Sequence, residues 1–246
     1  MVGSANQLSN RLIDALSEED KARWASHLER LDLPKGLVLY ESGHALTHAY
    51  FLTSGIVAKR YITQDGDTSE LALIGREGVI GTAAILGGRT NLGQARMLKA
   101  GTGFRMRTDT LMREFSRSSP VTLLLLRYTQ AYMTQMAQTA VCNRLHTLEK
   151  QLCRWLLMVM DRTGPDDILL TQEIIANMLG VRREGVTDAA LRLQRAGIIR
   201  YARGRIQVLD RDSLLARSCE CYRVVSLEYE RLLSHSADGT PPFWKR

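Results

Sequence analysis

The first apolar positions along the chain recur at the spacing of an amphipathic helix. They are Leu8, Leu12, Ile13, Leu16, Trp24, Leu28 and Leu31. Ser17, which is followed by three acidic residues, has the pattern of a helix N-cap with acids in the first turn. Residues 7–31 are therefore predicted to form one helix or two, and Pro34 closes the segment.

From Gly36 to about Arg107 the pattern changes to short apolar runs separated by glycine-containing turns. The runs are Leu37–Tyr40, Ala49–Thr53, Ile56–Ile62, Glu70–Ile74, Val79–Ile80, Arg96–Ala100 and Phe104–Arg107. Asp65-Gly66 is a good hairpin tip, and Gly101–Gly103 is interpreted as a strand connection. Many short strands at near-regular spacing predict an all-β roll or barrel. A short helix is expected at 109–117, with Asp109 as its cap.

A long helical pattern runs from Pro120 to about Met160, with a break expected near Asn143–Thr147. Its first half, Val121–Val141, contains one charged residue, Arg127. A helix that is apolar on more than one side must bury more than one side. An approximate 3.5-residue repeat runs through Leu125, Tyr128, Tyr132, Met136 and Thr139. We expect one face to pack on the roll and the other on a second subunit; the alternative is a central helix of a monomer.

The chain then passes a polar segment, Asp161–Asp167, which is predicted to be a linker. The elements expected after it are helices at Thr171–Leu179 and Arg183–Ala196, strands at Ile198–Tyr201 and Ile206–Leu209, and a last helix at Ser213–Leu233. Thr171 suits an N-cap, and Gly180 permits the positive backbone angle of a tight turn. With the small Ala176 and the branched Val186 beneath the turn, this pattern predicts a helix-turn-helix followed by a two-stranded wing.

The net charge of +7 is concentrated in one segment. Residues 182–205 carry seven arginines and two acids, whereas residues 1–120 are nearly balanced, with 15 basic and 13 acidic residues. The planar fork of arginine matches phosphates and guanine edges, so the segment favours contact with nucleic acid. On charge alone, the alternative is a solvated basic face.

The order of roll, long helix and winged helix-turn-helix resembles the Crp/Fnr transcription regulators over roughly residues 7–217. The most specific part is Thr171-Gln172-Glu173-Ile174-Ile175-Ala176 followed by Leu179-Gly180-Val181-Arg182-Arg183-Glu184-Gly185-Val186. The resemblance implies that Arg183 and Glu184 read base edges, the arginine on guanine and the glutamate on a cytosine amino group. Alternatively, Glu184 complements the helix dipole.

The resemblance also supplies the other candidates for DNA contact. They are Thr171, Gln172, Arg182, Thr187, Asp188, Arg203 and Arg205. Asp188 stands at a position where the family often has a base-reading arginine, so the usual half-site sequence is not expected. Most of the remaining candidates are expected to contact the DNA backbone, which sets position rather than sequence.

The roll resembles the family's cyclic-nucleotide-binding domain in layout but not in ligand chemistry. Nucleotide binders place a glutamate for the ribose and an arginine for the cyclic phosphate in the cassette that corresponds to Gly81–Ala95. Here Thr82 follows Gly81, and Leu92-Gly93-Gln94-Ala95 stand where the arginine is expected. The candidate effector-binding residues are Gly81, Thr82, Arg89, Gln94 and Ala95. We expect a site that is altered for another effector or unused.

No cofactor or metal is expected from the sequence. The four cysteines are Cys142, Cys153, Cys219 and Cys221. They contain no CxxC pair, so neither a zinc site nor an iron–sulfur cluster is predicted, and the family's oxygen sensors use an N-terminal cysteine cluster that is absent here. The histidines considered as haem ligands are interpreted as structural; they are His44, His48 and His146. The motifs of serine hydrolases, P-loop and Rossmann nucleotide binders and zinc proteases are absent.

The predicted fold is α+β, with four parts. They are an effector-sensing β-roll at 1–120, a dimerisation helix at 121–147, a winged helix-turn-helix at 148–217, and a C-terminal helix and tail at 218–246. The expected function is that of a homodimeric, sequence-specific DNA-binding regulator that recognises an inverted repeat. Its expected partners are double-stranded DNA, a small-molecule effector and, for an activator, RNA polymerase.

Two other functions remain open at this point: a signalling module whose C-terminal helices bind protein, and a nonspecific nucleic-acid binder. The chain shows no secretory signal and no run of 18 apolar residues, so a cytoplasmic location is expected.

Overall fold

The structure, a computed structural model, describes residues 9–164, 170–202 and 204–233. Two antiparallel four-stranded sheets form the N-terminal roll, with strand orders β1-β8-β3-β6 and β2-β7-β4-β5. The strands are β1 (Glu29–Leu33), β2 (Val38–Tyr40), β3 (His48–Leu52), β4 (Ile56–Ile62), β5 (Thr68–Ile74), β6 (Val79–Ile80), β7 (Gln94–Lys99) and β8 (Gly101–Arg107). Large apolar side chains such as Phe51, Ile80 and Met97 are fully buried in the roll. The sequence pattern placed strands β2 to β8 correctly to within a few residues, but it did not predict β1.

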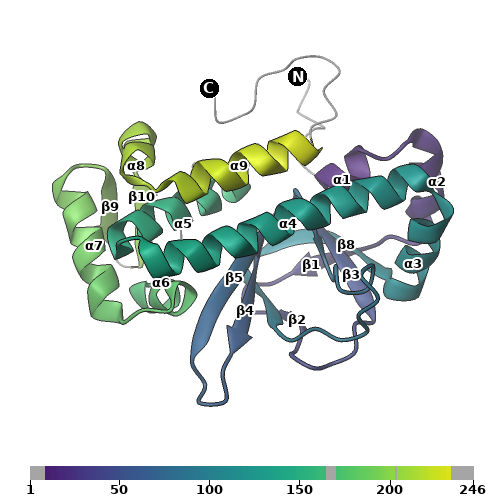
Figure 1. The fold of residues 1–246 in the computed structure, drawn as a ribbon, viewed down its shortest axis with the longest axis horizontal. Helices are drawn as coiled ribbons and strands as arrows, with labels where there is room; N and C mark the ends of the chain where they lie inside the picture. Colours follow the sequence, from purple (N-terminus) through teal and green to yellow (C-terminus); the bar gives the residue numbers. More distant parts are fainter. Residues whose placement is uncertain (1–8, 165–169, 203, 234–246) are drawn as a thin grey trace.

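Helices flank the roll and build the C-terminal half (Figure 1). They are α1 (Arg11–Asp14), α2 (Glu18–Ala25), α3 (Thr108–Arg117), α4 (Ser119–Leu145), α5 (Leu148–Thr163), α6 (Gln172–Leu179), α7 (Arg183–Arg195), α8 (Arg211–Arg217) and α9 (Glu220–Leu233). A two-stranded sheet of β9 (Ile199–Ala202) and β10 (Arg205–Val208) follows α7. The break expected in the long helix lies at His146 and Thr147, between α4 and α5.

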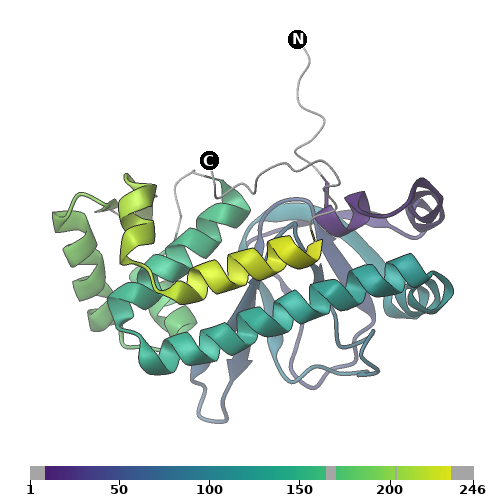
Figure 2. The ribbon, with the colours of Figure 1, turned by 45° about the horizontal axis from the view of Figure 1, so that its top comes forward.

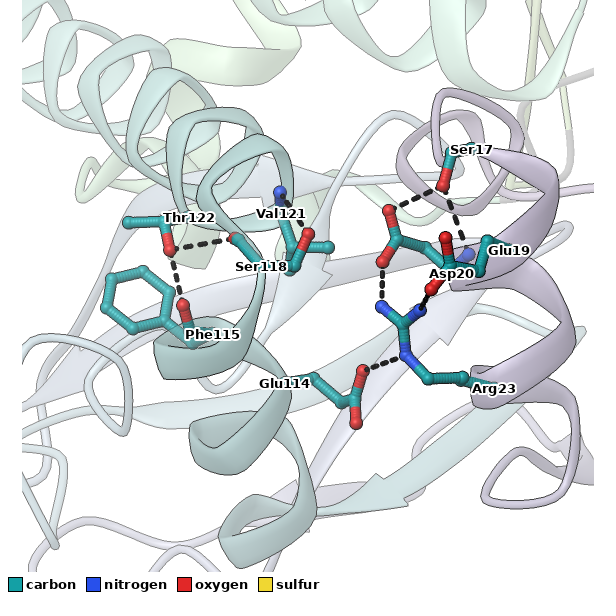
Figure 3. Close-up of polar contacts among 9 residues, drawn as sticks. All are labelled: Ser17, Glu19, Asp20, Arg23, Glu114, Phe115, Ser118, Val121 and Thr122. Carbon is teal, nitrogen blue, oxygen red and sulfur yellow. Dashed lines mark hydrogen bonds and ion pairs between the residues drawn. The ribbon is translucent and has the colours of Figure 1, made fainter.

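The N-terminal helices are fastened to α3 by a charged contact (Figure 3). Ser17 caps α2 as predicted, because its Oγ accepts a hydrogen bond from the Asp20 backbone N–H at 3.1 Å. Arg23 on the same helix binds Asp20 and also reaches Glu114 of α3, with 3.4 Å between Nε and Oε2. Ser118, at the start of α4, accepts from the Val121 backbone N–H at 3.5 Å. The ion pair holds α2 against α3, and the Ser118 cap starts α4 directly after α3.

Helix α9 lies antiparallel along α4 (Figure 2). The Tyr229 ring near the C-terminal end of α9 is 6.3 Å from the Tyr128 ring in the first half of α4. At the other end, the Cys221 sulfur in the first turn of α9 is 3.6 Å from His146, which caps α4. The C-terminal helix is thus packed against the long helix rather than forming a separate tail.

The winged part is joined to the roll through α5. Leu73 of β5 and Trp155 of α5 belong to one buried apolar cluster, which also contains the core of α6 and α7. The buried Arg162 forms an ion pair with Glu77, at 2.7 Å between Nε and Oε1, and also donates to Gln135 of α4. Residues 161–163, predicted to belong to a linker, are therefore the last turn of α5; residues 165–167 of that predicted linker lie outside the described residues.

Three other predictions about elements are wrong. Leu31 lies on strand β1 and not on a helix, although it does pack against the core. Asp109 lies in the first turn of α3, whose N-cap position is Arg107. Gly101–Gly103 belongs to β8, where a side chain on Gly103 would come within 2.7 Å of the Phe51 carbonyl oxygen, so glycine marks a close strand contact and not a turn.

The predicted last helix, Ser213–Leu233, is two helices. Ser218 has an extended backbone with ψ near 167°, and α8 ends there. Because α9 then begins at Glu220, the chain changes direction between Ser218 and Glu220, and α9 reaches α4.

Candidate nucleic-acid interface and effector domain

Helices α6 and α7 form the predicted helix-turn-helix. Thr171 caps α6, since its Oγ1 accepts from the Ile174 backbone N–H at 3.3 Å. Gly180 ends α6 in the left-handed conformation with φ at +66°, which glycine adopts without steric cost. Ala176 and Val186 are buried beneath the turn. The turn chemistry inferred from the sequence is therefore present.

The N-terminal turns of α6 and α7 share one exposed face. Thr187 of α7 donates a hydrogen bond from Oγ1 to Gln172 Oε1 of α6 at 2.9 Å, so the two helix starts are fixed side by side. The exposed residues at the start of α7 are Arg182, Arg183, Glu184 and Asp188. The backbone N–H groups at these two helix starts favour anions, and two arginines stand among them.

The wing lies close to the same face. The Cβ of a side chain at Gly204 would be 3.7 Å from Thr171 Cγ2, which puts the tip between β9 and β10 beside the start of α6. Arg205 is exposed at the first position of β10, opposite Ala202. Arg203 lies outside the described residues. Thr171, Gln172, Arg182, Arg183 and Arg205 thus come from three elements that meet at one end of the winged domain.

Not every arginine of the basic segment belongs to this face. Arg192, in the last turn of α7, pairs with Glu149 of α5 at 2.8 Å, and the second oxygen of Glu149 accepts from Arg217 at 3.1 Å. The hydrogen bond from Arg192 holds the pKa of the Glu149 carboxyl below its ordinary value. Arg192 therefore links α7 to α5, a role that counting charges along the sequence could not reveal.

The candidate effector residues come from three places in the roll: Gly81 and Thr82 directly follow β6, Arg89 lies between β6 and β7, and Gln94 and Ala95 begin β7, an inner strand of the other sheet. Gln94 is buried, and both ends of its amide are engaged: Arg60 Nε donates to Oε1 at 2.7 Å, and Nε2 donates to Glu41 at 2.7 Å. Ala95 and Thr82 are buried, and Gly81 has φ at +108°. Arg89 is exposed. A carboxylate and an amide thus lie near the position where an arginine is expected to meet a cyclic phosphate.

Helix α4 has two different faces. Tyr132, which together with Met136 is predicted from the 3.5-residue repeat to lie in the subunit interface, is buried inside this chain and stacks on Tyr128 with ring centroids 6.0 Å apart. The prediction for Tyr132 is wrong, because this side chain packs into the core of the roll. The large apolar side chains that remain exposed are Leu123, Leu126, Met133, Val141 and Leu145, between 41% and 72% exposed.

Three of these five residues, Leu123, Leu126 and Met133, lie on a different repeat, while Val141 and Leu145 each lie one position beyond it. The positions 123, 126, 130, 133, 137, 140 and 144 advance by alternating steps of three and four, the spacing of a coiled-coil seam. This repeat is also present in the sequence. Because α4 is apolar on several sides, the sequence alone does not show which of the two repeats faces the roll and which is exposed.

The fold and the exposed face define a winged helix-turn-helix DNA-binding protein that carries a ligand-binding type of roll. Residues 30–118 match the family model of the cyclic nucleotide-binding domain, and residues 150–217 match that of the Crp-like helix-turn-helix domain. The chain belongs to the Crp/Fnr family of DNA-binding transcription regulators, with an effector-binding domain ahead of the DNA-binding domain.

Solved structures share this fold. FixK2 from Bradyrhizobium japonicum is 17% identical with a TM-score of 0.68, and the match covers 78% of this chain and 98% of that one. A CRP-family transcriptional regulator from Thermus thermophilus is 19% identical, with a TM-score of 0.64 and coverage of 77% and 96%. The c-di-GMP-responsive global regulator CLP of Xanthomonas campestris is 15% identical, with a TM-score of 0.62 and coverage of 78% and 99%.

No curated protein matches the chain at a significant level. Among the described residues, no helix is both long and apolar enough to cross a membrane.

Proposed function

We propose that this regulator acts as a homodimer that recognises an inverted-repeat operator and that its effector is not cAMP. The observation that carries the proposal is the single exposed face that joins the starts of α6 and α7 to the wing, with Thr187 bound to Gln172. This face has the shape and charge for a major groove and its flanking phosphates. In this role the protein would work in the cytoplasm and, as an activator, would contact RNA polymerase.

The DNA contacts divide by position. Arg183 and Glu184, exposed in the first turn of α7, are assigned to base edges. Thr171, Gln172, Arg182 and Arg205 are assigned to phosphates, together with Arg203. Thr187 and Asp188, one turn further along α7, adjoin the base-reading positions; Asp188 cannot donate a hydrogen bond to guanine when it is ionised. The operator is therefore expected to differ from one read by arginine at that position.

The seam on α4 supports a homodimer. Leu126 is 43% exposed and Met133 is 53% exposed, and both lie on the 3-4 repeat, so a second copy of α4 would bury them. A two-fold dimer presents two identical recognition helices, and two half-sites about one helical turn apart follow from that symmetry.

The roll's chemistry argues against cAMP. A buried cyclic phosphate needs a charged donor, and charge-assisted bonds to arginine are the usual solution. Gln94 is neutral, and Arg60 beside it is already bound to Gln94 Oε1. Glu41, whose carboxylate accepts from Gln94, would repel a phosphate. An effector of lower negative charge suits the surroundings of Gln94 better.

Selection of the full-length protein on random DNA duplexes tests the function. We expect enrichment of an inverted repeat that survives an excess of random competitor DNA at a salt concentration where nonspecific binding is lost. Binding without an enriched motif would instead identify a nonspecific nucleic-acid binder. No retained DNA would favour a signalling module whose C-terminal helices bind protein.

A further inference from the structure

Three cysteines and a histidine meet at the end of α4, although the sequence places them about 75 residues apart. Cys142 and His146 come from the last turn and the cap of α4, while Cys219 and Cys221 come from the junction of α8 and α9. Their ligand atoms all lie within 4.8 Å of one another, and the three cysteines are buried. The Sγ atoms of Cys142 and Cys219 are 3.5 Å apart, too far for a disulfide, which needs about 2.05 Å.

We propose that Cys142, His146, Cys219 and Cys221 bind one Zn²⁺ ion. Tetrahedral zinc has Zn–S distances near 2.3 Å, which sets neighbouring ligand atoms about 3.5–3.8 Å apart. Two of the six separations match this value: 3.5 Å between the Cys142 and Cys219 sulfurs and 3.6 Å from Cys221 Sγ to His146 Nδ1. The remaining pairs lie within 4.8 Å, a distance that small side-chain rotations would shorten. Ligands that hold an iron–sulfur cube surround a much larger group, so this spacing fits a single ion.

The histidine is oriented as a zinc ligand. Its Nδ1 faces Cys221, while its Nε2 lies 3.3 Å from a carboxylate oxygen of Glu220. A metal-bound histidine commonly donates its other ring N–H to a carboxylate, which fixes the ring and the tautomer. Gln151 of α5 supports the same end of α4, because its Nε2 donates to the His146 carbonyl oxygen at 2.9 Å.

The charge balance also fits. Three thiolates, a neutral histidine and Zn²⁺ carry a net charge of −1, which needs a nearby cation in a buried site. Arg154 of α5 is 4% exposed and acts electrostatically on Cys142 and Cys221. Its Nη2 donates a hydrogen bond to Thr139 Oγ1 at 2.9 Å, and its Nε has no hydrogen-bond partner among the residues that the structure describes. Its charge balances the site.

A zinc ion would connect the end of α4, the joint between α4 and α5, and the start of α9. His146 is the first of the two residues between these helices, and the cysteines bring the start of α9 against it. The site would hold α9 on α4 and would fix the joint through which the winged domain follows the long helix.

The test is zinc content and affinity of the purified full-length protein. We expect about one zinc per chain. Cys219→Ser and Cys221→Ser should weaken zinc binding, measured by competition with a chromophoric chelator, by more than the roughly 10–100-fold that loss of a ligand's hydrogen-bond partner costs. Glu220→Gln, which removes the carboxylate partner of His146, should weaken zinc binding by a factor within that range. Cys153→Ser, a buried cysteine outside the cluster, is the matched control and should keep full zinc binding.

Cobalt provides a readout that does not depend on the folding of any variant. The wild-type chain loaded with Co²⁺ should show the absorption of tetrahedral thiolate-bound cobalt. The proposal is overturned if the reduced wild-type protein retains no zinc and gives no such spectrum, or if Cys153→Ser loses as much zinc as Cys219→Ser. Iron with an equal amount of inorganic sulfide would also overturn it, by showing a cluster instead.

Discussion

Single arginines on the DNA face are expected to have separable roles. Arg183 opens α7, where a side chain reaches the floor of the major groove, whereas Arg205 lies on the wing. Arg183→Ala should cost about 1–3 kcal/mol per half-site and relax preference at one base pair. Arg205→Ala should weaken binding to all duplexes alike and lower the salt slope by about one. Binding isotherms on a set of substituted operators at several salt concentrations measure both effects.

Arg195→Ala is the matched control for these variants. It removes an exposed arginine from the same helix, twelve residues and roughly 18 Å beyond Arg183. It should leave both base preference and salt slope unchanged. An unchanged base preference in Arg183→Ala, or a shifted one in Arg205→Ala, would contradict the division of roles.

The second residue-scale prediction concerns Gln94. Because the Gln94 amide is neutral, Arg60 Nε is already bound to it, and the Glu41 carboxylate lies beside it, cAMP should bind weakly or not at all. Isothermal titration calorimetry on the full-length protein measures this. A low-micromolar dissociation constant would contradict the prediction, and its loss in Arg89→Ala would identify the exposed Arg89 as the phosphate partner.

At the scale of elements, the exposed face of α4 leads to a prediction about the dimer. Leu126→Glu combined with Met133→Glu would place two charges per subunit in the proposed seam, at a cost of several kcal/mol to the dimer. Sedimentation velocity should then show a monomer, with loss of operator binding. Leu227→Glu, at an exposed leucine of α9, is the control and should remain dimeric. A dimer that persists in the double variant would place the interface elsewhere.

The same helix shows where sequence reasoning succeeds and where it fails. Apolar periodicity located α4 and its break, because both depend on local pattern. Periodicity could not choose between the register containing Tyr132 and that containing Met133, because both faces are apolar and only tertiary packing decides which one meets the roll. For the same reason Leu31, which is apolar and core-facing, was misassigned to a helix.

The helix-turn-helix was the most predictable element. Its cap at Thr171 and left-handed turn at Gly180 are encoded by residues a few positions apart. The wing followed from two short apolar runs around Gly204. In contrast, no proline or glycine near Ser218 indicates that the last helix is split there. The split depends on the packing of α9 against α4, which the sequence pattern does not reveal.

At the scale of the whole molecule, the contacts between distant segments were not predictable. Cys142 and Cys219 show no paired metal-ligand spacing, because their meeting depends on α9 folding back along α4. The pairing of Glu41 with Gln94 and of Glu77 with Arg162 is likewise set by the tertiary arrangement. These contacts determine the proposed zinc site, the surroundings of Gln94, and the junction of roll and winged domain.

One such contact, between the roll and α5, is expected to make the stability of the protein depend on pH. Glu70 of β5 is buried, and its Oε2 accepts from Trp155 Nε1 of α5 at 3.0 Å. Burial raises the pKa of the Glu70 carboxyl from 4.5 to about 7, despite the opposing effects of Trp155, Arg154 and Arg162. The folded protein therefore holds this proton more tightly than the unfolded chain does. Its contribution to the free energy of unfolding is fully present below about pH 4.5 and is lost as the pH rises through about 7.

Replacing Glu70 by Gln should remove this loss. The amide retains an oxygen to accept from Trp155 but never ionises, so Glu70→Gln should be more stable than wild type at about pH 8, by up to about 3 kcal/mol, and similar to it at about pH 5. Urea denaturation followed by the tryptophan signal at both pH values measures the difference. Glu29→Gln is the control: the hydrogen bond from Arg105 lowers the pKa of exposed Glu29, so its effect should not change over this interval. The prediction is contradicted if the stability of the wild type is the same at about pH 5 and about pH 8 and Glu70→Gln is no more stable at about pH 8. That result would show that Arg154 and Arg162 compensate the charge of the ionised Glu70 carboxylate.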